Sequence, residues 1–107
     1  MNLPPPIRTY FDADGKSDGA APLSAFTMDA VIEDENRTHR GHAAIEDWWR
    51  RAKAENQHIA KPFDLIVRDH VVEVQAEVSG NFAGSPATLT FTFRLNDDAI
   101  VDLRIGA

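Results

Sequence analysis

The sequence contains no cysteine, which excludes a disulfide bond and any chemistry that depends on a thiolate. Long hydrophobic runs are also missing, and no stretch approaches the roughly 18 apolar residues that a membrane-spanning helix needs. Residues 1–6 carry neither the basic residues nor the apolar segment of a signal peptide. We therefore expect a cytoplasmic protein that does not enter a membrane.

Positive charge is scarce, since 11 lysine and arginine residues stand against 17 acidic ones and leave a net charge of −6. Nucleic-acid binding needs a basic surface that neutralises phosphates, and anionic membrane surfaces attract basic amphipathic helices. The acidic balance argues against both partners and favours small molecules or proteins.

Motifs for metals and cofactors are missing too. The four histidines, His39, His42, His58 and His70, fall in no recognised metal-ligand spacing. The sequence has no glycine-rich phosphate loop and no dinucleotide-binding fingerprint. We therefore expect no metal and no cofactor.

The residues that are present suit one soluble domain over positions 1–107. The content of 43% hydrophobic and 26% charged residues is typical of globular proteins. Helical spacing dominates the first half of the chain and alternation dominates the second half. This segregation predicts an α+β protein whose helices pack on one face of an antiparallel sheet.

Helical spacing is clearest in the middle of the chain, where Ile45, Trp48, Trp49 and Ala52 form one apolar stripe. One of the two tryptophans should pack in the core, and the other should line a pocket mouth or an interface. The spacing predicts helices over residues 4–14, 20–26 and 42–56.

Alternation of apolar and polar residues marks the strands. Val72 and Val74 alternate with Glu73 and Gln75, which indicates one buried face and one wetter face. A proline at position 62 suggests that its strand lies at an edge or contains a bulge. The pattern predicts strands over residues 30–35, 59–68, 70–79, 87–95 and 99–105, with a short extended piece at 37–41.

The first of these strands carries an acid on its more apolar side. In an alternating strand, Asp34 shares a face with Ala30 and Ile32. In a pocket, desolvation would favour the neutral acid and make Asp34 a candidate proton carrier. The alternative is a solvated acid at the strand end, or a partner of Arg37 or Arg40.

The order of elements resembles the nuclear transport factor 2-like superfamily, and within it the SnoaL-like group. The residues that carry the resemblance are 7–11, 29–34 and 40–45, together with Trp48. The resemblance implies a cone-shaped curved sheet wrapped around a long helix, usually with an apolar pocket. The superfamily includes ketosteroid isomerases, cyclases, dehydratases, epoxide hydrolases and non-catalytic binding modules, so this fold leaves the function open.

The ketosteroid isomerases of this superfamily use a strand aspartate as proton shuttle and a tyrosine of the first helix as oxyanion donor. Asp34 and Tyr10 match these positions. The second donor of that family, an acid on a late strand, has no counterpart among the inward residues of 87–95. The resemblance thus implies proton-transfer chemistry without a complete steroid-isomerase site. Tyr10 can equally be a core tyrosine whose hydroxyl reaches a backbone carbonyl.

Two further groups complete the predicted site. His39 can act as an acid or base near neutral pH, or it can be a histidine of a surface loop. The wall of the pocket is predicted to consist of apolar and aromatic side chains, namely Ile32, Trp48, Phe91 and Phe93.

These observations support two hypotheses of different class. The first is a SnoaL-like protein that binds a small apolar, oxygen-bearing ligand and carries out acid–base proton transfer on it, as an isomerase, cyclase or lyase does. The alternative is a non-catalytic dimeric binding or scaffold module with a packed cone. A cavity of roughly 300 Å³ or more would favour the first. In either case we expect a homodimer formed through the polar outer face of the sheet.

Overall fold

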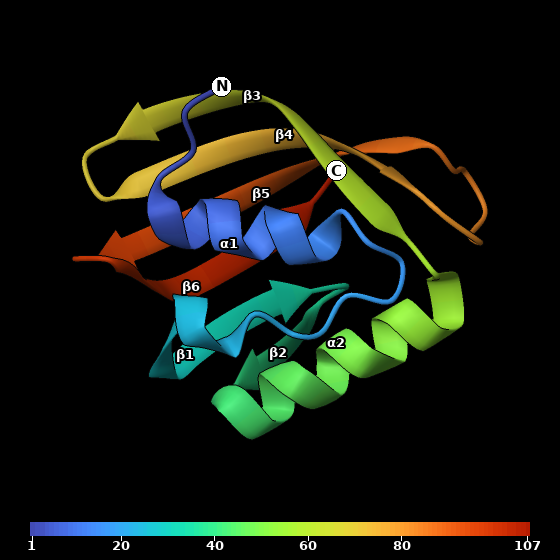
Figure 1. Cartoon of the computed structure of the whole chain (residues 1–107), viewed down its shortest axis with the longest axis horizontal. Coiled ribbons are helices and arrows are strands. Elements are labelled where there is room, and N and C mark those ends of the chain that lie inside the picture. Colours follow the sequence, from blue (N-terminus) through green and yellow to red (C-terminus); the bar gives the residue numbers. More distant parts are fainter.

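The computed structural model describes residues 1–107 and contains two α-helices and one six-stranded sheet. The elements are α1 (Pro5–Asp14), the 3-10 turn η1 (Leu23–Ala25), β1 (Phe26–Asp34), β2 (Arg37–Arg40), α2 (His42–Asn56), β3 (Ile59–Arg68), β4 (Val71–Ser79), β5 (Ala87–Asn96) and β6 (Ala99–Gly106). The predicted α+β class with a curved, open sheet is confirmed (Figure 1).

The strands follow the order β2-β1-β6-β5-β4-β3 across the sheet. All neighbours are antiparallel except β1 and β6, which run parallel, so the expectation of a uniformly antiparallel sheet is wrong for this one pair. A parallel pair needs a long crossover, and residues 35–98 separate these two strands. Strand β3 lies at an edge and shifts register between Pro62 and Asp64, as the proline predicted.

Both helices lie on the same face of the sheet (Figure 1). Helix α1 crosses in front of the middle of the sheet, whereas α2 lies beside β1 and β2. The core fills the space between the helices and the inward residues of the strands, which include Val74, Phe91, Phe93 and Leu103. The predicted core on this face is therefore confirmed, and the outer face of the sheet carries no helix.

Two predicted elements differ from the structure. The helix expected over 20–26 is only the turn η1, because Phe26 already begins β1 and seven residues are too few to nucleate a helix without strong packing. Strand β1 is longer than predicted at its start and ends at Asp34. Glu35 and Asn36 then adopt φ values of 52° and 63° and form a two-residue turn into β2.

A glycine joins β2 to the start of α2 and is hydrogen-bonded to β1. Gly41 has a φ of 85°, in the left-handed region that favours glycine. Its N–H donates to the carbonyl of Ala30 at 2.8 Å, and its own carbonyl accepts from Ile45 at 2.9 Å. The first turn of α2 is thereby fixed against β1, which sets the position of Trp48 two turns along the helix.

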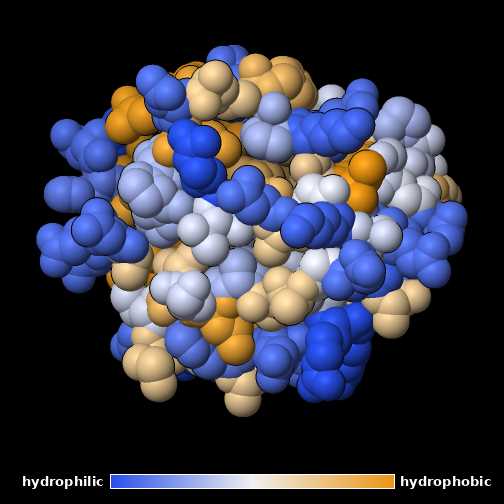
Figure 2. All heavy atoms as spheres, in the orientation of Figure 1, coloured by the Kyte–Doolittle hydropathy of each residue, from blue (hydrophilic) through white to orange (hydrophobic).

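The face that carries the helices is mainly hydrophilic, and its hydrophobic side chains are scattered among polar ones (Figure 2). No helix is both long enough and apolar enough to cross a membrane.

Candidate functional site

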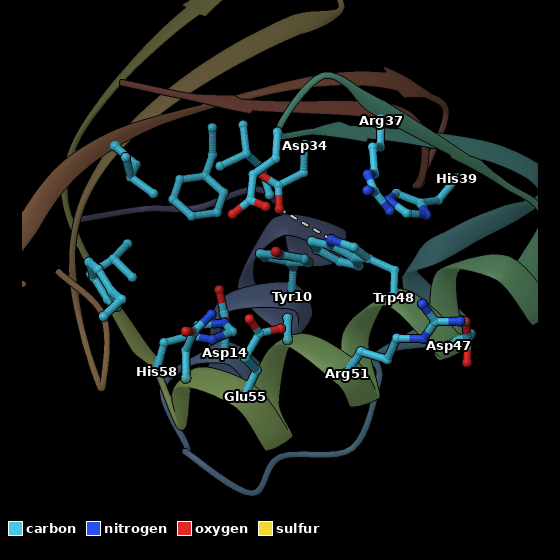
Figure 3. A pocket seen from close by; sticks show the side chains of 18 of the residues that line it. Tyr10, Asp14, Asp34, Arg37, His39, Asp47, Trp48, Arg51, Glu55 and His58 are labelled. Carbon is cyan, nitrogen blue, oxygen red and sulfur yellow. Dashed lines mark hydrogen bonds and ion pairs between the residues drawn. The ribbon is translucent and has the colours of Figure 1, made fainter.

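A cavity of about 620 Å³ opens between the two helices, the β1–β2 hairpin and the loop that follows β4. One wall is apolar and comes from the late strands and that loop, with Val78, Phe82, Leu89, Phe91 and Ile105. The remaining wall is rich in charged and aromatic side chains from α1, α2 and the hairpin (Figure 3). The pocket is therefore suited to a ligand that is apolar on one side and polar on the other.

Asp34 is placed in the pocket by the end of β1. It lies on the same strand face as the buried Ala30 and Ile32, and the turn that follows keeps it at the last strand position. The indole N–H of Trp48 donates to Asp34 Oδ2 at 3.2 Å (Figure 3). Asp34 forms no ion pair with either neighbouring arginine, so its other carboxylate oxygen is available to a ligand.

Tyr10 lies beneath Asp34 and is almost wholly buried, with 1% of its surface exposed. Its ring packs against other aromatic rings, namely Phe11, Phe26, Trp49, Phe91 and Phe93. Burial raises the pKa of Tyr10 well above its usual value, and the negative charges of Asp14 and Asp34 and a hydrogen bond to Asp14 raise this pKa further. Tyr10 is therefore a neutral hydroxyl, able to donate a proton in a hydrogen bond.

A buried ion pair lies at the base of the pocket. Asp14 and Lys53 are 2% and 6% exposed, and Lys53 Nζ lies 2.7 Å from Asp14 Oδ1. The same ammonium group donates to the carbonyls of Asp14 at 3.4 Å and His58 at 2.8 Å. His58 Nε2 lies 3.1 Å from Asp14 Oδ1. Because all three ammonium protons have acceptors, the buried charge is fully compensated.

Sequence reasoning missed this cluster, although a signal for it exists. Lys53 follows Trp49 by four residues, and Asp14 follows Tyr10 by four, so each charge continues the apolar stripe of its helix. A charge on a buried stripe is stable only with a partner. Two opposite charges on the stripes of two helices therefore predict that these helices meet at that point.

The other end of the pocket carries the second predicted acid–base group. His39 and Arg37 project from β2, and the His39 ring lies 5.9 Å from the Trp48 ring at a 34° tilt. Asp47 and Arg51 of α2 form an exposed ion pair of 2.9 Å at this rim (Figure 3). His39 is half-buried and lines the same cavity as Asp34.

The two tryptophans separate into the two predicted roles. Trp48 lines the pocket, whereas Trp49 is buried in the core and its indole N–H donates to the carbonyl of Gly19 at 2.8 Å. Phe91 is buried and also lines the pocket. Ile32 and Phe93, which were expected in the pocket wall, lie fully buried in the core and do not line the cavity. Phe93 instead packs against Tyr10 and Phe91, which do line the cavity.

No three metal-ligating side chains come together anywhere in the chain. The arrangement brings together a carboxylate at Asp34, a neutral hydroxyl at Tyr10 and an imidazole at each end of the pocket. Groups of this kind can take a proton from one ligand atom and donate a hydrogen bond or a proton to another.

The model of the SnoaL-like domain family matches residues 7–103, so the chain belongs to this family. A provisionally assigned polyketide cyclase (protein SMa1630) from Sinorhizobium meliloti is 43% identical and has a TM-score of 0.91. The alignment covers 96% of this chain and 94% of that protein.

Two more distant structures share the fold. A ketosteroid isomerase-like protein from Catenulispora acidiphila, solved with trimethylamine, is 17% identical, with a TM-score of 0.85 and coverage of 99% and 87% of the two chains. SalBIII, an epoxide hydrolase/cyclase-like enzyme in pyran ring formation in salinomycin, is 18% identical, with a TM-score of 0.71 and coverage of 95% and 87%. No match was found among the curated proteins.

The raised pKa of Tyr10 predicts that this residue resists ionisation in the folded protein. It is the only tyrosine, so near-ultraviolet tyrosinate absorbance reports on it alone. In denaturant the absorbance should rise near pH 10, the value for a free tyrosine. In the native protein it should rise only at a higher pH.

The sign of the linked stability follows from this shift. The pKa of Tyr10 is higher in the folded protein than in the unfolded chain. The contribution of the neutral Tyr10 hydroxyl to the free energy of unfolding is therefore fully present below about pH 10, and it is lost as pH rises through the folded-state pKa. Tyr10→Phe should remove both the absorbance and this alkaline loss. Native tyrosinate formation at the same pH as in denaturant would contradict the burial of the hydroxyl.

Proposed function

We propose that this protein is an acid–base enzyme of SnoaL-like type, which binds a small, largely apolar, oxygen-bearing ligand. Asp34 acts as the general base, and the Tyr10 hydroxyl turns its single proton from Asp14 to the ligand and donates a hydrogen bond to the ligand oxygen. The observation that carries the proposal is the presence of a carboxylate without a cationic partner and a neutral buried hydroxyl in one cavity with an apolar wall.

The proposed step moves a proton away from a carbon next to a carbonyl group. Asp34 takes the proton, the electron pair of the C–H bond forms the double bond of an enolate, and the negative charge moves to the carbonyl oxygen. Tyr10 stabilises that oxygen by donating a hydrogen bond to it. The Trp48 N–H holds the other oxygen of Asp34, so the base keeps one orientation.

The size of the cavity favours this proposal over a scaffold role. A volume of about 620 Å³ lies within the range of ligand pockets, and the aromatic side chains around Tyr10 do not fill it. The identity with the cyclase-assigned relative supports chemistry on an oxygen-bearing ligand, because that protein spans nearly the same chain.

A direct test uses 2-tetralone, an apolar bicyclic ketone with acidic protons next to its carbonyl group. Proton NMR in D2O measures how fast these protons exchange for deuterium. The protein should accelerate the exchange, and Asp34→Asn should reduce the acceleration by about 100-fold or more, as loss of a general base does. Tyr10→Phe should also reduce the acceleration of the exchange, by about 100-fold, as loss of an oxyanion donor does.

The matched control is Asp29→Asn, which neutralises an exposed carboxylate on the same strand but outside the pocket. This variant should accelerate the exchange of the probe's protons as much as the unchanged protein does. Equal exchange by Asp34→Asn and the unchanged protein would show that Asp34 is not the base. Loss of exchange in Asp29→Asn as well would indicate a general effect of charge.

We further propose that the protein forms a homodimer through the outer face of the sheet. This face carries no helix, and its central strands present short polar side chains, with Gln75 Nε2 donating to Thr90 Oγ1 at 2.9 Å. Ile66 of β3 is an exposed hydrophobic residue on this face, opposite Glu73 of β4. An uncovered face of this kind fits the self-complementary contact of a two-fold dimer.

Light scattering should therefore give twice the 11.9 kDa of one chain. Thr90→Arg, at the centre of the face, should shift the mass toward that of one chain, whereas Thr9→Arg on α1 should not. A single-chain mass for the unchanged protein at micromolar concentration would exclude the dimer.

A further inference from the structure

His58 lies at the end of the pocket opposite His39 and was not part of the predicted site (Figure 3). It stands between α2 and β3, and 18% of its side chain is exposed. Its Nε2 faces Asp14 Oδ1 at 3.1 Å, so this nitrogen carries a proton and donates a hydrogen bond to the carboxylate. The other nitrogen, Nδ1, is left without a partner in the protein.

This Nδ1 is accessible. Every buried side-chain nitrogen or oxygen in the protein has a hydrogen-bond partner, so an atom without a partner must be accessible. His58 also lines the cavity. The imidazole therefore has one nitrogen anchored on a buried acid and one accessible nitrogen, in a residue that lines the pocket.

The surroundings hold His58 in place. Lys53 Nζ donates to the His58 carbonyl at 2.8 Å, and the loop after β4 packs on the residue so closely that a Cβ on Gly80 would come within 2.8 Å of His58 Cα. The titratable groups around the ring are Asp14 of α1 and Lys53 and Glu55 of α2, while the loop and the end of β4 contribute none.

We propose that His58 is a second acid–base residue of the pocket, with Asp14 and Lys53 as positioning residues. This inference rests on the proposed function, because it supplies a partner for Asp34 on the other side of the ligand. As an imidazolium, His58 gives the Nδ1 proton to a ligand oxygen and keeps the Nε2 proton, which stays hydrogen-bonded to Asp14. As a neutral imidazole, it takes a proton through Nδ1. The ligand class is then a compound with two reacting atoms, one at Asp34 and one at His58.

Deuterium exchange of 2-tetralone in paired variants separates the two bases. The small probe can present its acidic protons to either base, so Asp34→Asn should leave a residual exchange that depends on His58. Asp34→Asn combined with His58→Gln should lower this residual exchange by about 100-fold. The control combines Asp34→Asn with His70→Gln, which alters an exposed histidine in a turn. This double variant should retain the residual exchange.

Residual exchange that is the same with and without His58→Gln would overturn the proposal and leave the role of Asp34 intact. Nitrogen-15 NMR of the histidine rings decides the point even where no exchange is seen. In its neutral form, His58 should carry its proton on Nε2, and added 2-tetralone should shift its Nδ1 signal but not that of His70. A proton on Nδ1, or a signal that the probe leaves unchanged, would overturn the assignment.

Discussion

The buried contact between Asp14 and Lys53 is the interaction on which the site depends. A carboxylate in the last turn of α1 faces the unfavourable negative end of the helix dipole, and a buried ammonium without partners would be costly. The two charges compensate each other at 2.7 Å, and the carbonyl of His58 takes a further ammonium proton. One cluster thus joins the end of α1, the end of α2 and the start of β3.

The pocket follows from this junction. Tyr10 lies one helical turn before Asp14, and Trp49 lies one turn before Lys53, so fixing the charges also fixes the two aromatic rings, whose centroids are 5.6 Å apart. The negative charge of Asp14 also helps to keep the Tyr10 hydroxyl neutral. A structural ion pair therefore has a chemical consequence, because it keeps the Tyr10 hydroxyl protonated in the same pocket as Asp34, the proposed base.

The sequence was sufficient for those features that repeat along one element. Alternation predicted the late strands, and helical spacing predicted α2. Asp34 was placed on an inward face because it shares that strand face with Ala30 and Ile32. Features that need two distant segments escaped prediction. Strand patterns do not encode the direction of a partner, so the parallel β1–β6 pair was missed. The role of His58 depends on a carboxylate from another helix, which no local pattern reveals.

The most direct test of this account is a double-mutant cycle on the free energy of unfolding, measured with urea. Asp14→Asn and Lys53→Met should each cost about 3–5 kcal/mol, because each leaves a buried group unpaired. The double variant should cost less than the sum of the two, with a coupling energy of about 1–3 kcal/mol. Additive costs would show that the two charges do not stabilise each other and would contradict the account.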